Sequence, residues 1–420
     1  MTRILLQGGN VLDPAHGSLL RRHDVLIEGE RIAAVSATPL DLPHPSETSD
    51  MPDLQRIDVT GKTVMPGLID CHVHVLASLA NLGLNATQPN VLVAIRALPI
   101  MRAMLERGFT TVRDAGGADW GLSQAVASGL IPGPRIFPSG KALSQTGGHG
   151  DFRPRGDTLE PCSCAFRAGA IARVVDGVDA VRLAVREEIQ KGATQIKIMA
   201  SGGVASPTDP IANTQYSEDE IRAIVAEAEA AQTYVAAHAY TPRAIARAVR
   251  CGVRSIEHGN LVDRAAAQVM REHGAFVVPT VITYEALARD GARLGLPAES
   301  VAKIETVRQA GHDSLRIYAE AGVPMAFGSD LLGEMHQCQS EEFRIRADAL
   351  GNLEAIRSAT SIAAALLQRE GELGTVRAGA VADLLVVDGD PLADIGLLMG
   401  QGEHLALVMQ GGRIHTRSAQ

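Results

Sequence analysis

The sequence has no long apolar run, no cluster of basic residues and few cysteines. Without an apolar stretch of about 20 residues it offers no membrane span. The apolar run before Gln7 has three residues, too short for the hydrophobic region of a secretory signal. A formal charge of −9, from 39 basic and 48 acidic residues, disfavours nucleic acid and anionic membranes as partners. We therefore expect a small-molecule substrate.

Cysteine is scarce, odd in number and scattered, which predicts a reducing, cytoplasmic location rather than a disulfide framework. One close pair has the spacing to offer two thiolates to a metal. No second pair lies near it in the sequence, so we expect loop cysteines there. The cysteines are Cys71, Cys162, Cys164, Cys251 and Cys338, and the close pair is Cys162 and Cys164.

The two ends of the chain resemble each other in texture. Residues 1–60 and 372–420 both alternate short β-branched runs with Gly-containing turns. Neither flank is long enough to bury a good core alone. We expect them to form one small composite β-sandwich, with the stretch 36–54, rich in Pro, Ser and Asp, as an exposed loop. Residues 61–371 form the second predicted domain.

Residues 61–371 alternate short apolar runs with amphipathic stretches in a βα rhythm. The helical stretch 217–232, for example, begins with Ser217 as N-cap and Glu220 as its capping-box partner. Eight such units favour an α/β fold of the (β/α)₈ TIM-barrel type, whose active site lies at the carboxyl ends of the strands. A doubly wound open sheet has the same rhythm, but the first strand lacks its Gly-rich phosphate turn. The eight strand candidates begin at residues 63, 108, 134, 194, 233, 254, 275 and 323.

Ionisable residues stand where the predicted strands end. In "GLIDCHVHV", residues 67–75, strand alternation sends His72 and His74 to the same side. A histidine in a strand is often only a hydrogen-bonded core residue, but several strand ends here carry one. Gathered in a packed core without an ion to hold, such groups would be costly, so their pattern favours metal ligation. The full set is His72, His74, Lys197, His238, His258 and Asp330.

Lys197 interrupts the apolar strand "TQIKIMA", and a lysine buried there must be neutralised, paired or chemically changed. Addition of CO₂ to its amine would give a carbamate, an anionic ligand with two oxygens that can bridge two metal ions. The alternative is a structural lysine paired with an acid such as Asp114. Asp330 has its own alternative as a cap of the following helix. At a strand end it can instead bind a metal and accept a proton from bound water.

Several motifs together resemble the amidohydrolase superfamily, metal hydrolases with a (β/α)₈ barrel and a β-sandwich made from both termini. They are "MPGLIDCHVHV", "QIKIMASGG", "AAHAY", "SIEHGN", "FGSD" and the tail "GTVRAGAVADLLVVDGDPL". They occur in the order typical of that family and span essentially the whole chain. The resemblance implies two divalent metal ions, with zinc expected. It assigns His72 and His74 to the more buried ion, His238 and His258 to the more exposed one, carboxylated Lys197 as the bridge, and Asp330 as ligand and proton shuttle.

Lys197 favours the binuclear amide and ester hydrolases over deaminases and imidazolonepropionase-like enzymes, which generally use one metal and lack this lysine. Further stretches resemble a branch containing Xaa-Pro dipeptidases, N-acyl-amino-acid hydrolases and ochratoxin-degrading amidases. This implies that Tyr240 polarises the scissile carbonyl and that His149 helps to hold the substrate's free carboxylate. The alternatives are a packed aromatic role for Tyr240 and a loop-fixing role for His149. The stretches are "SQTGGHGD" from 144, "HAYT" from 238 and "SGGVASPTDPIANTQYSEDE" from 201.

Two loop features are weaker candidates. Arg153 and Arg155 follow His149, but loop arginines are usually solvated. The loop 202–216 is rich in Gly, Pro, Asp and Asn, and its length predicts a flap from which Tyr216 reaches the substrate.

We therefore expect hydrolysis of an amide bond whose leaving group is an amino acid, with Asp330, Tyr240 and His149 as catalytic residues. The substrates would be dipeptides or N-acyl-amino acids, including ochratoxin A. A cyclic-amide or imidazolonepropionase-like hydrolase is the alternative enzyme, and its activity would survive loss of His149. A binding or scaffold protein on an inactive barrel would lack ligands, and none is missing. The resemblance also favours a homo-oligomer such as an octamer, whereas the leaving residue depends on loop geometry.

Overall fold

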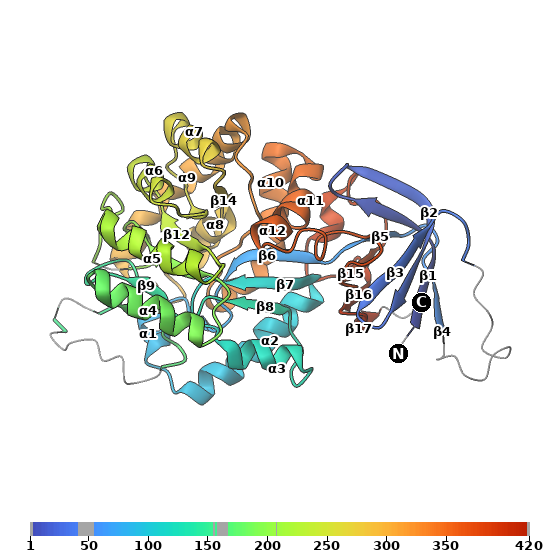
Figure 1. Cartoon of the computed structure of the whole chain (residues 1–420), viewed down its shortest axis with the longest axis horizontal. Coiled ribbons are helices and arrows are strands. Elements are labelled where there is room, and N and C mark those ends of the chain that lie inside the picture. The colour runs from blue at the N-terminus through green and yellow to red at the C-terminus, as the bar shows by residue number, and fades with distance from the viewer. Residues whose placement is uncertain (1–2, 41–53, 154–155, 158–166, 207, 418–420) are drawn as a thin grey trace.

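The computed structural model describes residues 3–40, 54–153, 156–157, 167–206 and 208–417. A barrel of strands wrapped by helices occupies one end of the molecule, and a β-sheet that contains both chain ends occupies the other (Figure 1). No helix in this described part is both long and apolar enough to cross a membrane.

The sheet at the end of the molecule is built from both flanks of the sequence. Its strands run in the order β17-β16-β15-β5-β1-β2-β3, with β4 paired to β1. The flanks join where β5 pairs antiparallel with β15. The predicted meeting of the two termini is therefore observed, while the exact domain boundaries stay a prediction. The strands are β1 (Arg3–Asp13), β2 (Ser18–Glu28), β3 (Arg31–Ser36), β4 (Leu54–Asp58), β5 (Thr63–Pro66), β15 (Leu384–Val387), β16 (Leu405–Gln410) and β17 (Arg413–Arg417).

The barrel consists of parallel strands in two hydrogen-bonded groups. One group has the order β6-β7-β8 and the other β10-β9-β11-β12-β13-β14. The strands are β6 (Leu68–Val73), β7 (Phe109–Asp114), β8 (Arg135–Pro138), β9 (Ala142–Ser144), β10 (Ala172–Val174), β11 (Ile196–Met199), β12 (Val235–Ala239), β13 (Ser255–His258) and β14 (Phe276–Val278).

Hydrogen bonds close the barrel where the strand pairing is interrupted. The stretch predicted as one strand from 134 divides into β8 and β9, and the backbone N of Thr194 donates to the O of Pro138 at 2.8 Å across the division. The last predicted strand, 323–330, is an extended segment rather than a regular strand. Its Ala326 N donates to Val277 O at 2.9 Å, and its Phe327 O accepts from Cys71 N at 2.7 Å. This segment thus joins β14 to β6, and the TIM-barrel prediction is confirmed.

The stretch predicted as a single first strand also divides, at Gly67. Thr63–Pro66 belongs to the terminal sheet and Leu68–Val73 to the barrel. A Cβ at Gly67 would lie 2.1 Å from Thr110 Oγ1, so the chain can pass this point only without a side chain. The His72 and His74 motif is therefore connected almost directly to the terminal sheet.

Helices cover the outside of the barrel, and strand alternation decides what faces them. In β11, Ile196 and Ile198 pack with Val181 of α4 and Ile224 of α5 in one apolar cluster. Alternation sends Lys197 to the opposite, inner side. The predicted capping box between Ser217 and Glu220 is present at the start of α5. The helices are α1 (Leu82–Ala86), α2 (Asn90–Glu106), α3 (Trp120–Ala127), α4 (Val178–Gln190), α5 (Glu218–Ala230), α6 (Pro242–Arg250), α7 (Arg264–Glu272), α8 (Val281–Asp290), α9 (Ala298–Ala321), α10 (Glu342–Leu350), α11 (Asn352–Ser358) and α12 (Ser361–Leu366), with 3₁₀ helices η2 (Gly333–Glu341) and η3 (Ile395–Leu398).

The terminal sheet and the barrel share one apolar cluster. Leu385 and Val408 of the sheet pack in the same buried group as Phe109 of β7 and Met101 of α2. The side chain of Leu385 lies directly against Gly108, where a Cβ would be 2.9 Å from Leu385 Cδ1. The two parts are therefore joined by a common core rather than by a linker.

Candidate active site

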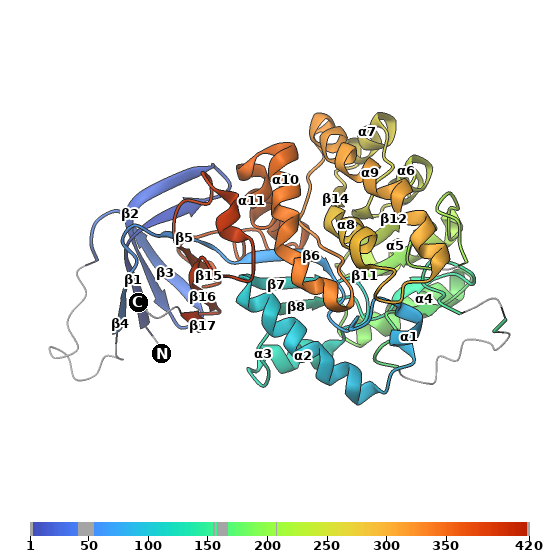
Figure 2. The same ribbon diagram turned by 180° about the vertical axis from the view of Figure 1, so that it is seen from behind.

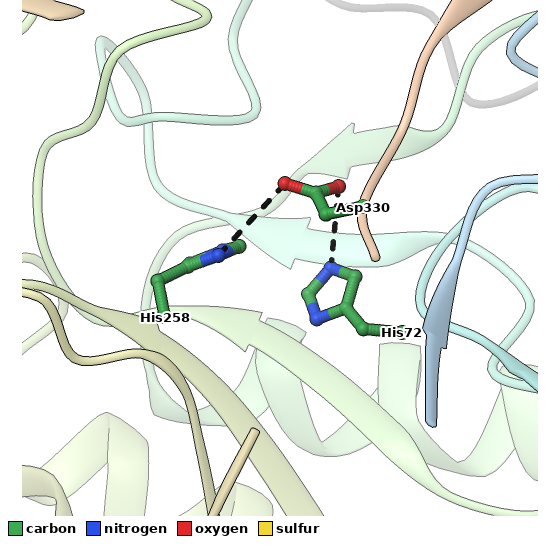
Figure 3. A group of neighbouring side chains, drawn as sticks. All are labelled: His72, His258 and Asp330. Atoms are coloured by element: carbon green, nitrogen blue, oxygen red, sulfur yellow. Dashed lines mark ion pairs between the residues drawn. The ribbon is translucent and has the colours of Figure 1, made fainter. Parts of the chain in front are cut away.

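His72 and His74 point toward Asp330 at the mouth of the barrel. The Nδ1 of His72 is hydrogen-bonded to Glu257 Oε2 at 2.6 Å, and the Nδ1 of His74 to Gly116 O at 2.9 Å. The Nε2 atoms of the two histidines lie 3.5 and 3.3 Å from Asp330 Oδ1. Figure 3 shows Asp330 between His72 and His258. In each imidazole of the motif, Nδ1 is thus hydrogen-bonded to a neighbouring oxygen, and Nε2 faces the Asp330 carboxylate.

His238 and His258 complete a ring of imidazoles. His238 Nε2 is 3.1 Å from Gly202 O, and His258 Nδ1 is 2.8 Å from Thr280 Oγ1. The two ring centroids are 4.7 Å apart, and the His258 ring is 4.9 Å from that of His72. As in the first pair, a neighbouring oxygen fixes one nitrogen of each ring. The other nitrogen is left to act as a ligand atom for a metal ion in the cluster.

The backbone at two of these residues is strained. His258 has a φ of 70° and Asp330 a φ of 50°. Both values lie in the left-handed region, which residues other than glycine rarely adopt. Each residue ends the strand or segment that carries it. At β13 this geometry lets the neighbouring residues Glu257 and His258 both contact His72, which regular alternation would prevent.

The electrostatics of the cluster suit a cation. Burial, reinforced by nearby positive charge, lowers the pKa of His72, His238 and His258 well below the usual value, so these imidazoles are neutral and can act as ligands. Burial opposes a charge on His74, but its hydrogen bond with Asp330 raises its pKa. Burial also disfavours an ionised Asp330, yet the neighbouring histidines and Lys197 hold its pKa below the usual value. A positive charge is thus favoured beside an ionised carboxylate.

Lys197 lies inside the barrel with only 2% of its surface exposed. Burial lowers the pKa of this amine to about 8, against the opposing charges of Glu257 and Asp330. Within the described residues no carboxylate oxygen lies within the 4.0 Å of an ion pair with its Nζ. Asp114 instead accepts hydrogen bonds from three backbone N–H groups, so the alternative of a Lys197 and Asp114 ion pair is wrong.

The donor groups fit a divalent metal ion. His72, His258 and Asp330 each offer a ligand atom, and these atoms lie within 4.8 Å of one another. Neutral imidazole nitrogens with a carboxylate oxygen are the ligands that zinc and related ions prefer. The structure therefore contains a metal-binding cluster in the described part of the barrel mouth.

Tyr240 and His149 border the same cluster. The Tyr240 ring centroid is 4.7 Å from that of His238 and 5.5 Å from that of His258. His149 stacks on His238 with centroids 4.1 Å apart, and its Nδ1 is 2.8 Å from Ser206 Oγ. The structure thus brings every residue of the predicted site to one mouth: His72, His74, His149, Lys197, His238, Tyr240, His258 and Asp330.

Residues 63–414 match the amidohydrolase family. The chain belongs to this family. Among solved structures, a prolidase complexed with N-methylphosphonate-L-proline is 71% identical to this amidohydrolase, has a TM-score of 0.96 and covers 99% of this chain and 100% of its own. A Xaa-Pro dipeptidase with bound methionine is 30% identical, with a TM-score of 0.85 and coverage of 99% and 100%. The ochratoxinase of Aspergillus niger is 33% identical over 96% of this chain and 85% of its own length.

These similarities confirm the predicted branch of the family. The chain is a prolidase-like amidohydrolase, a metal-binding hydrolase of C–N bonds, and it is homologous to ochratoxinase. These similarities therefore disfavour the alternative that the barrel is a non-catalytic scaffold.

The described residues of the loop 202–216 of the amidohydrolase pack against His149 and are held at several points. A Cβ at Gly203 would lie 2.2 Å from the His149 ring, so the backbone touches the imidazole. Asp209 accepts from the side chain of Ser206 and from Gly203 N, the latter at 3.2 Å. Lys303 of α9 donates to the carbonyl oxygens of Gly203, Ser206 and Asp209 at 3.0, 2.8 and 2.7 Å.

The weaker loop predictions fare differently. The Tyr216 hydroxyl donates to Val175 O at 3.1 Å, and its ring is 4% exposed in the core, so the prediction that Tyr216 reaches the substrate is wrong. The guanidinium group of Arg153 donates two hydrogen bonds to the Asp151 carboxylate, at 2.8 and 2.7 Å. Arg155, Cys162 and Cys164 lie outside the described residues.

Sequence reasoning missed the residues that support the ligands of the amidohydrolase site. Glu257 accepts from Arg113 Nη2 at 2.7 Å as well as contacting His72. Its position in the strand "SIEHGN" is a signal of the same kind as Lys197, a charge inside an apolar strand. Thr280 and Tyr284 follow β14 and carry no such signal, because a polar residue at the start of a helix is commonplace.

Proposed function

We propose that the protein is a binuclear, metal-dependent dipeptidase that hydrolyses the amide bond before a C-terminal amino acid. Xaa-Pro dipeptides are the first substrates to test, followed by N-acyl-amino acids and ochratoxin A. The observation that carries this proposal is the position of His149, stacked on His238 beside the metal-binding cluster. The 71% identity to a prolidase bound to a proline phosphonate supports the same substrate class.

Two zinc ions bridged by carboxylated Lys197 would explain the composition of the cluster. The amine of Lys197, with a pKa of about 8, is partly neutral at neutral pH, and its lone pair can attack CO₂. The nitrogen loses a proton as the carbamate forms, so a buried cation becomes an anion. Bound divalent ions would supply a water nucleophile active at neutral pH and a Lewis acid for the carbonyl.

Three side chains of the protein would transfer the proton, polarise the carbonyl group and bind the substrate's carboxylate. The Asp330 carboxylate, held ionised, accepts a proton from the attacking water and returns it to the departing nitrogen. The Tyr240 hydroxyl donates to the carbonyl oxygen, where negative charge develops. His149 donates its Nδ1 hydrogen to Ser206, whose own hydroxyl hydrogen goes to Asp209, so the imidazolium form of His149 would donate from Nε2 to the substrate's carboxylate.

The test is a substrate panel on zinc-loaded protein. Dipeptides with varied C-terminal residues, N-acyl-amino acids and ochratoxin A are compared with their C-terminal carboxamides. We expect hydrolysis of free-carboxylate substrates, with kcat/KM reduced for carboxamides and for His149→Asn. Protein with two bound ions per chain that cleaves none of them contradicts the proposal. Hydrolysis of cyclic amides that persists in His149→Asn would support the alternative enzyme.

We further propose that the chain forms a homo-oligomer. Leu84 of α1 and Val91 and Ile95 of α2 are large apolar side chains exposed by 56%, 71% and 58%. Both helices lie at the same edge of the barrel (Figure 2). Light scattering during size-exclusion chromatography measures the mass, and a stable monomer contradicts this proposal.

A further inference from the structure

We propose that Tyr284 donates a hydrogen bond to the oxygen of Tyr240 and so leaves the Tyr240 hydroxyl hydrogen for the substrate. Tyr284 is then a positioning residue that acts through Tyr240. This inference rests on the proposed function, in which Tyr240 donates to the scissile carbonyl oxygen.

The two phenols meet beside the metal-binding cluster. The Tyr284 hydroxyl, in the first turn of α8, is 2.6 Å from the Tyr240 hydroxyl. The ring centroid of Tyr284 is 6.3 Å from that of His258. Tyr240 and Tyr284 are each at most 2% exposed, so bulk water does not compete for this bond.

Counting hydrogens gives the bond a direction. A phenol has a single hydroxyl hydrogen. If Tyr240 donates its hydrogen to the substrate's carbonyl oxygen, the hydrogen in the Tyr240–Tyr284 bond comes from Tyr284.

The hydrogen of Tyr240 is then the group available to a ligand. In this arrangement the Tyr240 oxygen accepts from Tyr284, and the Tyr240 ring already lies beside His238 and His258.

A Tyr240 hydroxyl hydrogen that is already directed at the carbonyl oxygen should stabilise mainly the transition state. Negative charge grows on the carbonyl oxygen during attack, so a fixed donor stabilises that state more than the bound substrate. Chains of hydrogen bonds also polarise each successive hydroxyl. Loss of Tyr284 should therefore lower kcat and change KM little.

The experiment is a double-mutant cycle with Tyr240→Phe and Tyr284→Phe on zinc-loaded protein. For an Xaa-Pro dipeptide we expect Tyr284→Phe to lower kcat roughly 3- to 10-fold in the native background. In the Tyr240→Phe background the same substitution should have no further effect. Equal losses of kcat in both backgrounds, or a change in KM alone, overturn the proposal.

Binding of a proline phosphonate gives a readout that needs no turnover. Calorimetry should show that Tyr284→Phe weakens this tetrahedral analogue by the same factor, again only when Tyr240 is present, while affinity for L-proline is unchanged. Tyr216→Phe is the matched control, because it removes a buried phenol bonded to Val175 O. If the phosphonate cycle holds but no dipeptide is hydrolysed, the proposed function fails and the positioning role of Tyr284 stands. If dipeptides are hydrolysed but neither cycle shows coupling, the positioning role alone fails.

Discussion

Single residues inside the barrel carry charges that the fold must neutralise. Lys197 and Glu257 are both almost fully buried, yet they are handled differently. Glu257 is surrounded by donors from Arg113, Ser255 and His72. Lys197 has no carboxylate at ion-pair distance among the described residues, which makes chemical modification the simplest way to complete its environment. The two residues therefore yield separate predictions.

Assembly of the site from metal-free protein should be faster at higher pH. Only the neutral amine of Lys197 can add CO₂, and below its pKa of about 8 that fraction rises roughly tenfold per pH unit. With Zn²⁺ and dissolved CO₂ held fixed, we expect recovery of dipeptide hydrolysis to be faster near pH 8 than near pH 6.5, and to level off above pH 8. Carbon-13 NMR should detect the carbamate. A recovery rate that does not change with pH, or a fully metallated and active Lys197→Ala variant, would refute the carbamate.

Glu257→Gln should destabilise the fold and weaken the metal site. The substitution leaves the buried Arg113 guanidinium without its charged partner, which costs about 3–5 kcal/mol. It also removes the carboxylate that orients His72, so metal affinity should fall about 10- to 100-fold. Urea unfolding and zinc titration measure the two effects. The exposed Arg264 and Glu320 pair provides the control, because Glu320→Gln should cost less than about 1 kcal/mol. Equal losses in both variants would contradict this account.

At the scale of elements, the described residues of the loop 202–216 link His149 to the rest of the barrel. Its Ser206 fixes one nitrogen of His149, while Lys303 of α9 ties three of its carbonyl groups. The Ser206 contact fixes the orientation of the His149 imidazole, whereas the Lys303 contacts fix the position of the loop backbone. These two roles can be separated by experiment.

Ser206→Ala should impair recognition of the substrate's carboxylate selectively. Without the hydroxyl at Nδ1, the His149 ring loses the bond that fixes its orientation. We expect kcat/KM for a free dipeptide to fall roughly 3- to 10-fold, while that for its carboxamide hardly changes. Lys303→Met loosens the same loop without touching His149 and should affect both substrates in parallel. Parallel losses in Ser206→Ala as well would show that the hydroxyl only supports the loop.

Elements also mark where sequence reasoning succeeded and where it stopped. Strand alternation and the βα order were enough to place His72, His74 and Lys197 at one mouth, because those rules depend on local backbone geometry. They could not foresee the left-handed backbone of His258, which brings Glu257 into the site beside it. Contacts such as that of Tyr284 with Tyr240 depend on how a helix docks, and this is set by packing of the whole barrel.

For the whole molecule, the decisive feature is the apolar cluster shared by the barrel and the terminal sheet. Leu385 of the sheet and Phe109 of the barrel belong to one buried group. Apolar contact this extensive makes the two parts dependent on each other for stability.

Leu385→Ala should therefore weaken the barrel as well as the sheet. Truncation of a fully buried leucine costs about 2–5 kcal/mol. We expect one cooperative transition, shifted as a unit, with circular dichroism and loss of activity coinciding. Two separate transitions, with activity surviving the first, would show that the sheet folds independently. Leu183→Ala on α4, at a side chain exposed by 58%, is the control and should leave the transition within about 0.5 kcal/mol.

The closure of the barrel between the 323–330 segment and β6 has a consequence for biosynthesis. The backbone N of Asp330 donates to His72 O at 2.8 Å, so the first and last ligands meet only at this seam. A ribosome must release more than three quarters of the 420 residues before Asp330 can reach His72. The complete metal cluster therefore cannot form on a short nascent chain. We therefore expect complete metal loading to follow synthesis of the last barrel segment.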